Sequence, residues 1–422
     1  MKLLVLGGGG REHAICWKMA QHRDIQALFC APGNAGIASI AQCIDLPSQD
    51  NFSDLVRFVR QEKIDLTLVG PEAPLVAGIV DIFQQEGLTI FGPCQKAAQL
   101  EGSKVFAKRF MARHDIPTAE FEVFSNPEQA LTYIDTCRHP LVIKADGLAQ
   151  GKGVFVTNTK AEAQQAVSKI MVEKAFGAAG EHIVLERKLQ GRELSFLIVT
   201  DGVSIKPLVS SQDHKPLSEG NRGPNTGGMG AYSPAPLSPK LYGAIMRKVV
   251  TPTLRGLKQE NISYTGVLYF GLMISQDTPY VLEYNCRFGD PETQVILPRL
   301  RTDLVDLALA TTRGNLSQTQ VHWRNDAAAC VILASRGYPG HYEKGVAIHG
   351  LEALSANTNI FAFSAGVDRQ DNQYVTAGGR VLGITATGKN INSAAHEAYR
   401  AVAKIQFEGM CYRKDIGRAP AG

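Results

Sequence analysis

An apolar run that ends in four consecutive glycines opens the chain and limits the folds available to it. Residues 2–6 have the composition of a buried strand, residues 7–10 are all glycine, and residues 12–21 have the pattern of a helix. A strand, a tight glycine turn and a helix in this order begin a doubly wound α/β domain. We therefore predict a Rossmann-like N-terminal domain. Its further elements are expected as strands at 27–30, 66–69 and 89–91 and one helix at 75–85.

The glycine run does not match the dinucleotide-binding fingerprint. That pattern, G-x-G-x-x-G, needs a sixth-position glycine, but Glu12 stands there when Gly7 is counted first and His13 when Gly8 is first. The second predicted strand also ends without an acidic residue to accept hydrogen bonds from a ribose. What remains is a glycine loop at a helix N-terminus beside Arg11, which suits a phosphate group, or else a plain tight turn.

Length and composition narrow the class of protein. At 422 residues the chain is too long for one ordinary core, and about 150 residues per domain suggests about three domains. The net charge of +4 includes no long basic run, so nucleic-acid and membrane-surface binding have no compositional support. No apolar stretch reaches membrane-spanning length. Eight cysteines without a C-x-x-C pair predict reduced thiols in a cytoplasmic protein, not a zinc site or a disulfide framework.

Alternating polar residues mark the segment at 281–292. Glu283, Asn285 and Arg287 fall at every second position, so they are predicted to share one face of a strand. Carboxylate and amide oxygens are ligands that Mg²⁺ prefers, and a neighbouring guanidinium can hold a phosphoryl oxygen. The alternative is an edge strand with a solvated polar face.

Residues 140–156 predict two short strands joined by a glycine-rich loop. The first strand delivers Lys144 and the second covers 154–156, with Gly147, Gly151, Lys152 and Gly153 between them. The spacing is one residue too short for a phosphate-binding P-loop, and no Ser or Thr follows the lysine. We expect a mobile cap over an anion; a glycine hairpin with solvated lysines is the alternative.

Two further segments suit a nucleotide and a small substrate. The apolar strand at 183–186 leads to Leu189 and Glu193, which could offer an adenine slot and a ribose-binding carboxylate. Residues 213–215 read Asp-His-Lys and precede a glycine-rich loop at 223–230. Small residues allow the backbone to approach a ligand, although a disordered linker would have a similar composition.

Together these motifs resemble the ATP-grasp superfamily and, within it, the glycinamide ribonucleotide synthetase (phosphoribosylamine-glycine ligase) family of purine biosynthesis. The most specific parts are the 223–230 loop and the segment NCRFGDPE at 285–292. The likeness covers nearly the whole chain, through residues 7–13, 31–36, 69–72, 99–104, 143–153, 212–215, 223–234, 283–292, 378–381 and 413–417.

The resemblance implies a multidomain protein of α/β and α+β type. Residues 1–101 would form an N-terminal domain that receives the substrate phosphate, and residues 102–325 an ATP-grasp domain with a mobile lid at about 122–190. Residues 326–422 would form a small C-terminal α+β domain, with strands at 329–333 and 381–385 and a helix at 393–405. We find no separate chemistry in this last domain, so we expect it to contribute stability and closure of the substrate cleft.

The resemblance also implies a reaction. ATP, glycine and 5-phosphoribosylamine would give ADP, phosphate and glycinamide ribonucleotide through glycyl phosphate, with the protein aligning and neutralising charge. The enzyme would be a monomer or weak homodimer. Another ATP-grasp ligase with a different carboxylate, or a catalytically silent nucleotide sensor, are the alternatives.

Residue roles follow from the same resemblance. Lys104 and Lys144 would hold ATP phosphates below the loop formed by Gly147, Gly151, Lys152 and Gly153, while Glu186 and Leu189 border the adenine and Glu193 the ribose. Glu283 and Asn285 would bind Mg²⁺ or Mn²⁺. Arg287, Lys144, Asp213 and Lys215 are the catalytic candidates. The substrates would contact Gly9, Gly10, Arg11, Glu72, Asp213, His214, Lys215, Asn225, Thr226, Gly227, Gly228, Arg287 and Asp290.

Two positions depart from the pattern that the resemblance implies. Arg187 and Lys188 follow Glu186 where many relatives carry an acidic and then an aromatic residue. The predicted strand at 268–273 also lacks the carboxylate that ATP-grasp enzymes usually place before the metal-binding strand. The adenine edge and the number of metal ions therefore stay open.

Overall fold

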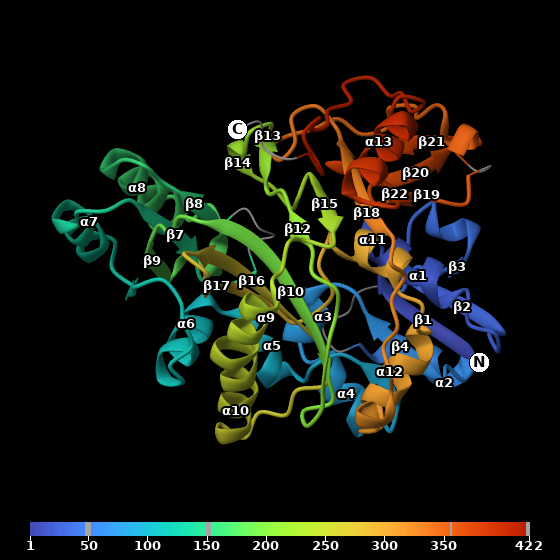
Figure 1. Cartoon of the computed structure of the whole chain (residues 1–422), viewed down its shortest axis with the longest axis horizontal. Helices are drawn as coiled ribbons and strands as arrows, with labels where there is room; N and C mark the ends of the chain where they lie inside the picture. The colour runs from blue at the N-terminus through green and yellow to red at the C-terminus, as the bar shows by residue number, and fades with distance from the viewer. Residues whose placement is uncertain (47–51, 149–152, 355–356, 419–422) are drawn as a thin grey trace.

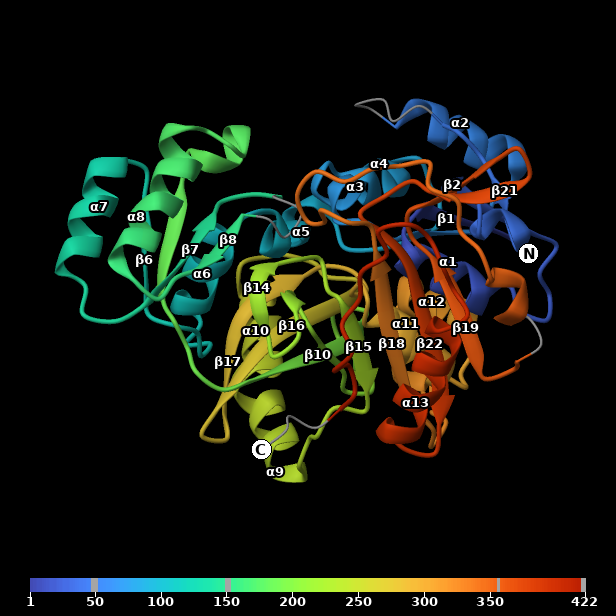
Figure 2. The same cartoon turned by 90° about the horizontal axis from the view of Figure 1, so that it is seen from above.

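The computed structural model describes residues 1–46, 52–148, 153–354 and 357–418. The N-terminal and C-terminal regions lie together at one end of the molecule, and a smaller unit of strands and helices projects at the other end (Figures 1 and 2). The central sheet lies between these two ends. The α/β and α+β multidomain architecture expected from the sequence is confirmed.

Five parallel strands form the N-terminal sheet in the order β3-β2-β1-β4-β5. Leu3, Val5, Leu66 and Leu68 are fully buried, as expected for the central strands of a parallel sheet that helices cover on both faces. The doubly wound prediction is therefore confirmed. The elements are β1 (Lys2–Gly7), α1 (Gly10–Met19), β2 (Ala27–Pro32), β3 (Gln42–Cys43), α2 (Ser53–Glu62), β4 (Leu66–Val69), α3 (Glu72–Val76), α4 (Ile79–Gln85), β5 (Ile90–Phe91) and α5 (Gln95–Gly102).

The single helix predicted at 75–85 is wrong. The structure has two short helices, α3 and α4, with Gly78 between them at φ +89°. A residue in this left-handed conformation cannot continue a right-handed helix, and glycine adopts it without steric cost. The break allows α3 to begin at Glu72, directly after β4, and this places the Glu72 side chain at the carboxyl edge of the sheet.

The projecting unit contains a four-stranded sheet in the order β6-β9-β7-β8. Leu141, Ile143 and Leu185 pack against its helices in one apolar cluster. Because side chains alternate along a strand, the intervening Lys144 and Glu186 lie on the opposite face. The elements are β6 (Phe121–Phe124), α7 (Pro127–Thr136), β7 (Leu141–Ala145), β8 (Val154–Val156), α8 (Lys160–Val167) and β9 (Ile183–Arg187).

A second four-stranded sheet, in the order β11-β10-β16-β17, forms the centre of the molecule. Phe196, Leu268 and Phe270 pack with Phe110 and Leu257 of the helices in one buried cluster. β17 is an edge strand, and its residues Glu283 and Asn285 are only partly buried. The elements are α6 (Lys104–Arg113), β10 (Arg192–Thr200), β11 (Ile205–Pro207), α9 (Pro239–Ile245), α10 (Thr251–Gln259), β16 (Gly266–Ser275) and β17 (Thr278–Asn285).

The C-terminal sheet recruits strands from far earlier in the chain. Its order is β12-β15-β18-β22-β19, and β12 (Gln212–Asp213) and β15 (Gly230–Ser233) precede the C-terminal region. Antiparallel pairing places Gly230 opposite Val331. The remaining elements are β13 (Pro216–Ser218), β14 (Arg222–Asn225), β18 (Ala327–Ala334), β19 (Ile360–Ser364), β20 (Val367–Gln370), β21 (Gln373–Thr376), β22 (Arg380–Gly388) and α13 (Ile391–Val402).

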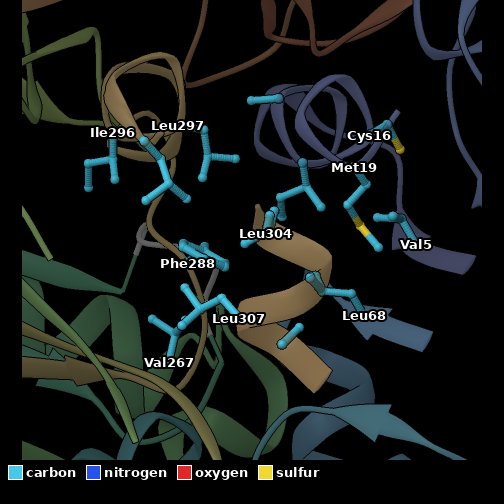
Figure 3. Close-up of a cluster of buried hydrophobic side chains, with 14 of the residues drawn as sticks. Val5, Cys16, Met19, Leu68, Val267, Phe288, Ile296, Leu297, Leu304 and Leu307 are labelled. Carbon is cyan, nitrogen blue, oxygen red and sulfur yellow. The ribbon is translucent and has the colours of Figure 1, made fainter. Parts of the chain in front are cut away.

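One hydrophobic cluster joins these regions. Figure 3 shows Val5 and Leu68 of the N-terminal sheet near Leu304 and Leu307, with Val267 on the other side of the same cluster. Leu304 and Leu307 belong to α12 (Leu304–Thr312), which follows the short helix α11 (Thr293–Ile296). The N-terminal sheet and the central sheet therefore share a core. Among the described residues, no helix has the length and apolar character needed to cross a bilayer.

Candidate active site

A cavity of about 1160 Å³ lies between the projecting sheet, the central sheet and the N- and C-terminal regions. Nineteen of the side chains or glycines predicted as site residues line it: Arg11, Glu72, Lys104, Lys144, Gly147, Gly153, Glu186, Leu189, Glu193, Asp213, His214, Lys215, Asn225, Thr226, Gly227, Glu283, Asn285, Arg287 and Asp290. Gly9, Gly10 and Gly228 are not among its lining residues. Gly151 and Lys152 lie outside the described residues.

A buried carboxylate organises the lysines on one wall of the cavity. Glu186 forms ion pairs with Lys144, at 2.6 Å, and with Lys108. Lys144 also donates to the Leu282 carbonyl at 2.9 Å, which ties the projecting sheet to β17. Burial lowers the pKa of Lys108 to about 8 against the opposing effect of Glu186. Lys108 is absent from the sequence prediction, although its position four residues after Lys104 on one helix places both on the same face.

The start of α6 is joined to the end of β7. Ser103 caps α6 by accepting from the Phe106 amide at 3.0 Å. Asp146 accepts from the Ser103 hydroxyl at 2.9 Å and from the Val105 amide at 3.1 Å. Lys104 then donates to the Gly147 carbonyl at 2.9 Å. The two segments that were expected to bind phosphates thus lie together in the folded chain.

The polar face of β17 borders the cavity. Glu283 forms an ion pair with Lys215 at 2.8 Å, and Asn285 lines the same cavity. Burial alone would raise the pKa of Glu283, but Lys215 lowers it to about 2, so this carboxylate stays ionised. The opposite holds for Asp213, where burial raises the pKa well above its ordinary value, with Glu292 adding to the rise and Lys215 opposing it.

Arg287 is not part of the strand face on which the alternation placed it. β17 ends at Asn285, and Arg287 lies beyond it, between two carboxylates. It contacts Glu72 at 3.2 Å and Glu101 at 2.6 Å. Burial would raise the pKa of Glu72, but Arg287 and Arg11 lower it to about 2. Glu101 was missed because a carboxylate at a helix end gives no sequence signal of its partner.

The glycine loop at the start of α1 approaches the site from the N-terminal region. The Gly9 amide donates to Glu12 at 2.7 Å, and Arg11 donates to the same carboxylate at 2.6 Å and to the Phe288 carbonyl at 3.1 Å. A Cβ on Gly9 would lie 3.6 Å from the Asp290 carboxylate. Helix α1 therefore directs its N-terminus towards the segment that follows β17.

Glu292 is a second carboxylate of the cavity that the sequence prediction missed. It accepts from Tyr269 at 2.7 Å and from Ser195 at 3.0 Å, and it is 2% exposed. Tyr269 lies on β16, the strand that lacks an acidic residue of its own. The segment following β17 thus brings a carboxylate to a strand that has none, a relation visible only after folding.

The loops at 213–228 complete the cavity wall. His214 is buried, which lowers the pKa of its imidazole to about 4, and Arg413 adds to this effect. The Thr226 hydroxyl donates to the Lys215 carbonyl at 2.6 Å and accepts from the Gly228 amide at 3.0 Å. The glycine-rich loop is therefore an ordered turn and not a linker.

Comparison with known proteins gives the family. Models of the phosphoribosylglycinamide synthetase N domain, ATP-grasp (A) domain and C domain match residues 1–101, 102–293 and 328–419. The chain belongs to the phosphoribosylglycinamide synthetase family. Phosphoribosylamine–glycine ligases from Allochromatium vinosum and Caldanaerobacter subterraneus are similar to it, with 50% and 47% identity over 99% of the chain and 98% and 99% of those proteins.

Two solved structures have a fold similar to that of this chain. The crystal structure of phosphoribosylamine–glycine ligase from Thermotoga maritima superposes with a TM-score of 0.85 at 36% identity, covering 98% of this chain and 100% of that one. Biotin carboxylase from Campylobacter jejuni has a TM-score of 0.73 at 15% identity, over 99% of this chain and 94% of that one. The second likeness concerns the fold alone.

Proposed function

We propose that this protein is a phosphoribosylamine–glycine ligase, which joins glycine to 5-phosphoribosylamine with ATP and releases glycinamide ribonucleotide, ADP and phosphate in de novo purine biosynthesis. Phosphoribosylamine–glycine ligases that match this chain along nearly their whole length support the proposal. The observation that carries it is the convergence of Lys104, Lys108 and Lys144 on one cavity that also holds ionised Glu283.

The chemistry requires a poor electrophile to be energised. A carboxylate oxygen of glycine attacks the γ-phosphorus of ATP, the bond to ADP breaks, and glycyl phosphate forms. The amine of phosphoribosylamine then attacks the glycyl carbonyl, phosphate leaves, and the amine loses a proton. No protein nucleophile takes part, so the residues bind, orient and neutralise charge.

The lysine wall fits a triphosphate. Lys104, Lys108 and Lys144 stand near one another with Glu186 and Glu283 as their carboxylate neighbours, and burial lowers the pKa of Lys104 and of Lys108. An anionic ligand would offset this concentration of positive charge. Lys104 and Lys144 would contact the phosphates, while Glu186, Leu189 and Glu193 would border the adenosine.

Glu283 and Asn285 fit a hard divalent cation. Both offer oxygen donors to the cavity, and the Glu283 carboxylate is ionised. Bound Mg²⁺ or Mn²⁺ would screen the phosphate charges, and Glu283 would exchange its Lys215 partner for the ion. Arg287 would stabilise charge on the transferred phosphoryl group, and Asp213 and Lys215 would orient glycine.

The remaining roles concern substrate capture and closure. The loop that begins at Gly147 and ends at Gly153, with Gly151 and Lys152 within it, would close over the nucleotide and exclude water from the acyl phosphate. Gly9, Gly10, Arg11 and Glu72 would receive the ribose phosphate end. Asp290 and the loops at 214–215 and 225–228 would contact the amine. We further propose a cytoplasmic monomer or weak homodimer.

A direct assay tests the proposal. The purified protein with Mg²⁺ and ATP should release ADP only when glycine and phosphoribosylamine are both present, the latter formed in situ from ribose 5-phosphate and ammonia. Mass spectrometry should detect the glycinamide product. ADP release that is indifferent to glycine would refute the proposal, and a panel of other carboxylates would detect a ligase of different specificity.

A further inference from the structure

The loop at 225–228 connects the cavity to the C-terminal region. It joins β14 to β15, and β15 pairs with β18 of the C-terminal sheet. Asn225, Thr226 and Gly227 line the cavity. This loop therefore connects the cavity wall to the C-terminal sheet, and Arg380 of the C-terminal region lines the same cavity.

Two C-terminal side chains hold both polar groups of one glycine. The Gly227 amide donates to the Tyr338 hydroxyl at 2.9 Å, and Arg380 donates to the Gly227 carbonyl at 2.7 Å. A Cβ on Gly227 would lie 3.1 Å from the Arg380 guanidinium carbon and 3.2 Å from the Tyr338 oxygen. Glycine at this position allows this close approach.

Arg380 also binds the segment that follows β17. Its guanidinium donates to the Asp290 carbonyl and to the Asp290 carboxylate, each at 3.0 Å. Burial would raise the pKa of Asp290, but Arg380 holds it below its usual range. Gln294 accounts for the second carboxylate oxygen, donating to it at 2.8 Å.

The backbone segments around Gly228 and Asp290 are packed so closely that a displacement of one would move the other. A Cβ on Gly228 would lie 2.5 Å from the Pro291 ring, and Gly9 faces the Asp290 carboxylate as described above. Arg380 thus contacts loop 225–228 and Asp290 directly, and the glycine loop of α1 approaches the same Asp290 carboxylate. Each of these three segments carries residues to which we assign the binding of glycine or the phosphoribosylamine.

We propose that Arg380 is a positioning residue for the amine substrate, which sets the relative placement of loop 225–228 and Asp290 and so gives the C-terminal region a direct part in substrate specificity. This inference rests on the proposed function. The lysines that would hold ATP make none of the contacts described for Arg380. We therefore expect the loss of Arg380 to affect only the side of the cavity that binds the amine and glycine.

Kinetics of Arg380→Ala provide the test. The KM for phosphoribosylamine should rise roughly ten- to hundredfold, as expected for loss of charge-assisted hydrogen bonds, while the KM for ATP stays within about twofold. Arg380→Lys should restore part of the affinity because it retains one charged donor. Tyr338→Phe, which loses only the bond to the Gly227 amide, should raise the same KM by a smaller factor of about three to ten.

Two controls separate a positioning role from a general structural one. Arg400→Ala removes an exposed arginine that pairs with Glu397 in the same region, and its kinetics should match the parent protein. Hydrogen exchange of the amides at 225–228 should accelerate in Arg380→Ala and Tyr338→Phe but not in Arg400→Ala. An equal rise in the KM values for ATP and the amine would overturn the inference, and so would unchanged exchange at 225–228. Absence of ligase activity in the parent protein would instead reject the proposed function, while the exchange experiment would still test the loop contacts.

Discussion

Glu283 remains ionised although it is partly buried, because Lys215 contacts it at 2.8 Å. Loss of this charge should lower the affinity for the metal ion more than it lowers the stability of the fold. We predict that Glu283→Gln raises the Mg²⁺ concentration for half-maximal activity by at least about tenfold, since a neutral amide is a poorer ligand for a hard cation. Magnesium titrations of the initial rate would measure this.

A matched control is available outside the cavity. Glu260 pairs with Arg113 and His114 at the end of α10, so Glu260→Gln removes a paired carboxylate without touching the cavity. Its magnesium dependence should equal that of the parent protein. Similar shifts in the two variants would argue against a metal-binding role for Glu283.

Arg287 provides a second prediction for a single residue. Arg287→Ala should leave nucleotide affinity within about twofold and raise the activation barrier by about 2–4 kcal/mol, comparable to losing one donor to a developing oxyanion. The substitution also leaves Glu72 and Glu101 without their shared cation, so its unfolding free energy should be measured in parallel. An unchanged turnover number would contradict the assigned role.

Residue identity at the site was predictable to an uneven degree. Lys104, Lys144, Glu283 and Asn285 belong to motifs with recognisable spacing, and all line the cavity. Glu101, Lys108 and Glu292 line the same cavity but could not be assigned from sequence, because each depends on partners from distant segments. A carboxylate or lysine in a helix ordinarily indicates solvent exposure, and only the folded chain shows that these are buried.

At the scale of elements, Asp146 couples the projecting sheet to α6. Asp146→Ala removes the acceptor for the Ser103 hydroxyl and the Val105 amide. We expect the unfolding free energy to fall by about 1–2 kcal/mol, the usual cost of losing a helix N-terminal acceptor. The KM for ATP should also rise, because Asp146 no longer holds the start of α6, with Lys104, next to Gly147. Urea denaturation and steady-state kinetics would measure the two effects.

The projecting unit offers its own control for this prediction. Thr159 caps α8 by accepting from the Glu162 amide at 3.2 Å, and neither residue lines the cavity. Thr159→Ala should lose a similar amount of stability and keep the KM for ATP unchanged. If both variants raise that KM alike, general loosening of the projecting unit explains the result and the specific coupling is wrong.

The positions of individual strands were predicted from the sequence better than the pairing between strands. Alternation and apolar runs predicted the strands around Lys144, Glu186 and Glu283, since these depend on neighbouring residues. The split of the helix at 75–85 depends on one glycine conformation, which periodicity does not report. The recruitment of β12 and β15 into the C-terminal sheet depends on strand pairing over about a hundred residues of chain, which no local pattern encodes.

At the scale of the whole molecule, His13 of the N-terminal region contacts the C-terminal region. Its Nδ1 accepts from the Ser364 amide at 2.8 Å, and burial lowers the pKa of the imidazole to about 4. As the pH falls, His13 therefore takes up a proton near pH 6.5 in the unfolded chain but only near pH 4 in the folded chain. Stability contributed by this neutral histidine is present above pH 6.5 and is lost as the pH falls.

We predict that the parent protein loses about 2 kcal/mol more unfolding free energy between pH 7 and pH 5 than His13→Gln does. Glutamine does not titrate, and its side-chain oxygen can accept from the same amide. Urea denaturation of both proteins at the two pH values measures the difference. Parallel losses in the two proteins would show that His13 is not a source of the acid sensitivity.

The cluster shared by α1, α12 and Phe363 has a consequence for biosynthesis on the ribosome. Helix α1 is among the first segments to emerge, and it packs not only on the N-terminal sheet but also on α12 and β19, which are translated much later. The part of its apolar surface that α12 and β19 cover in the folded protein therefore stays exposed for most of the synthesis of the chain.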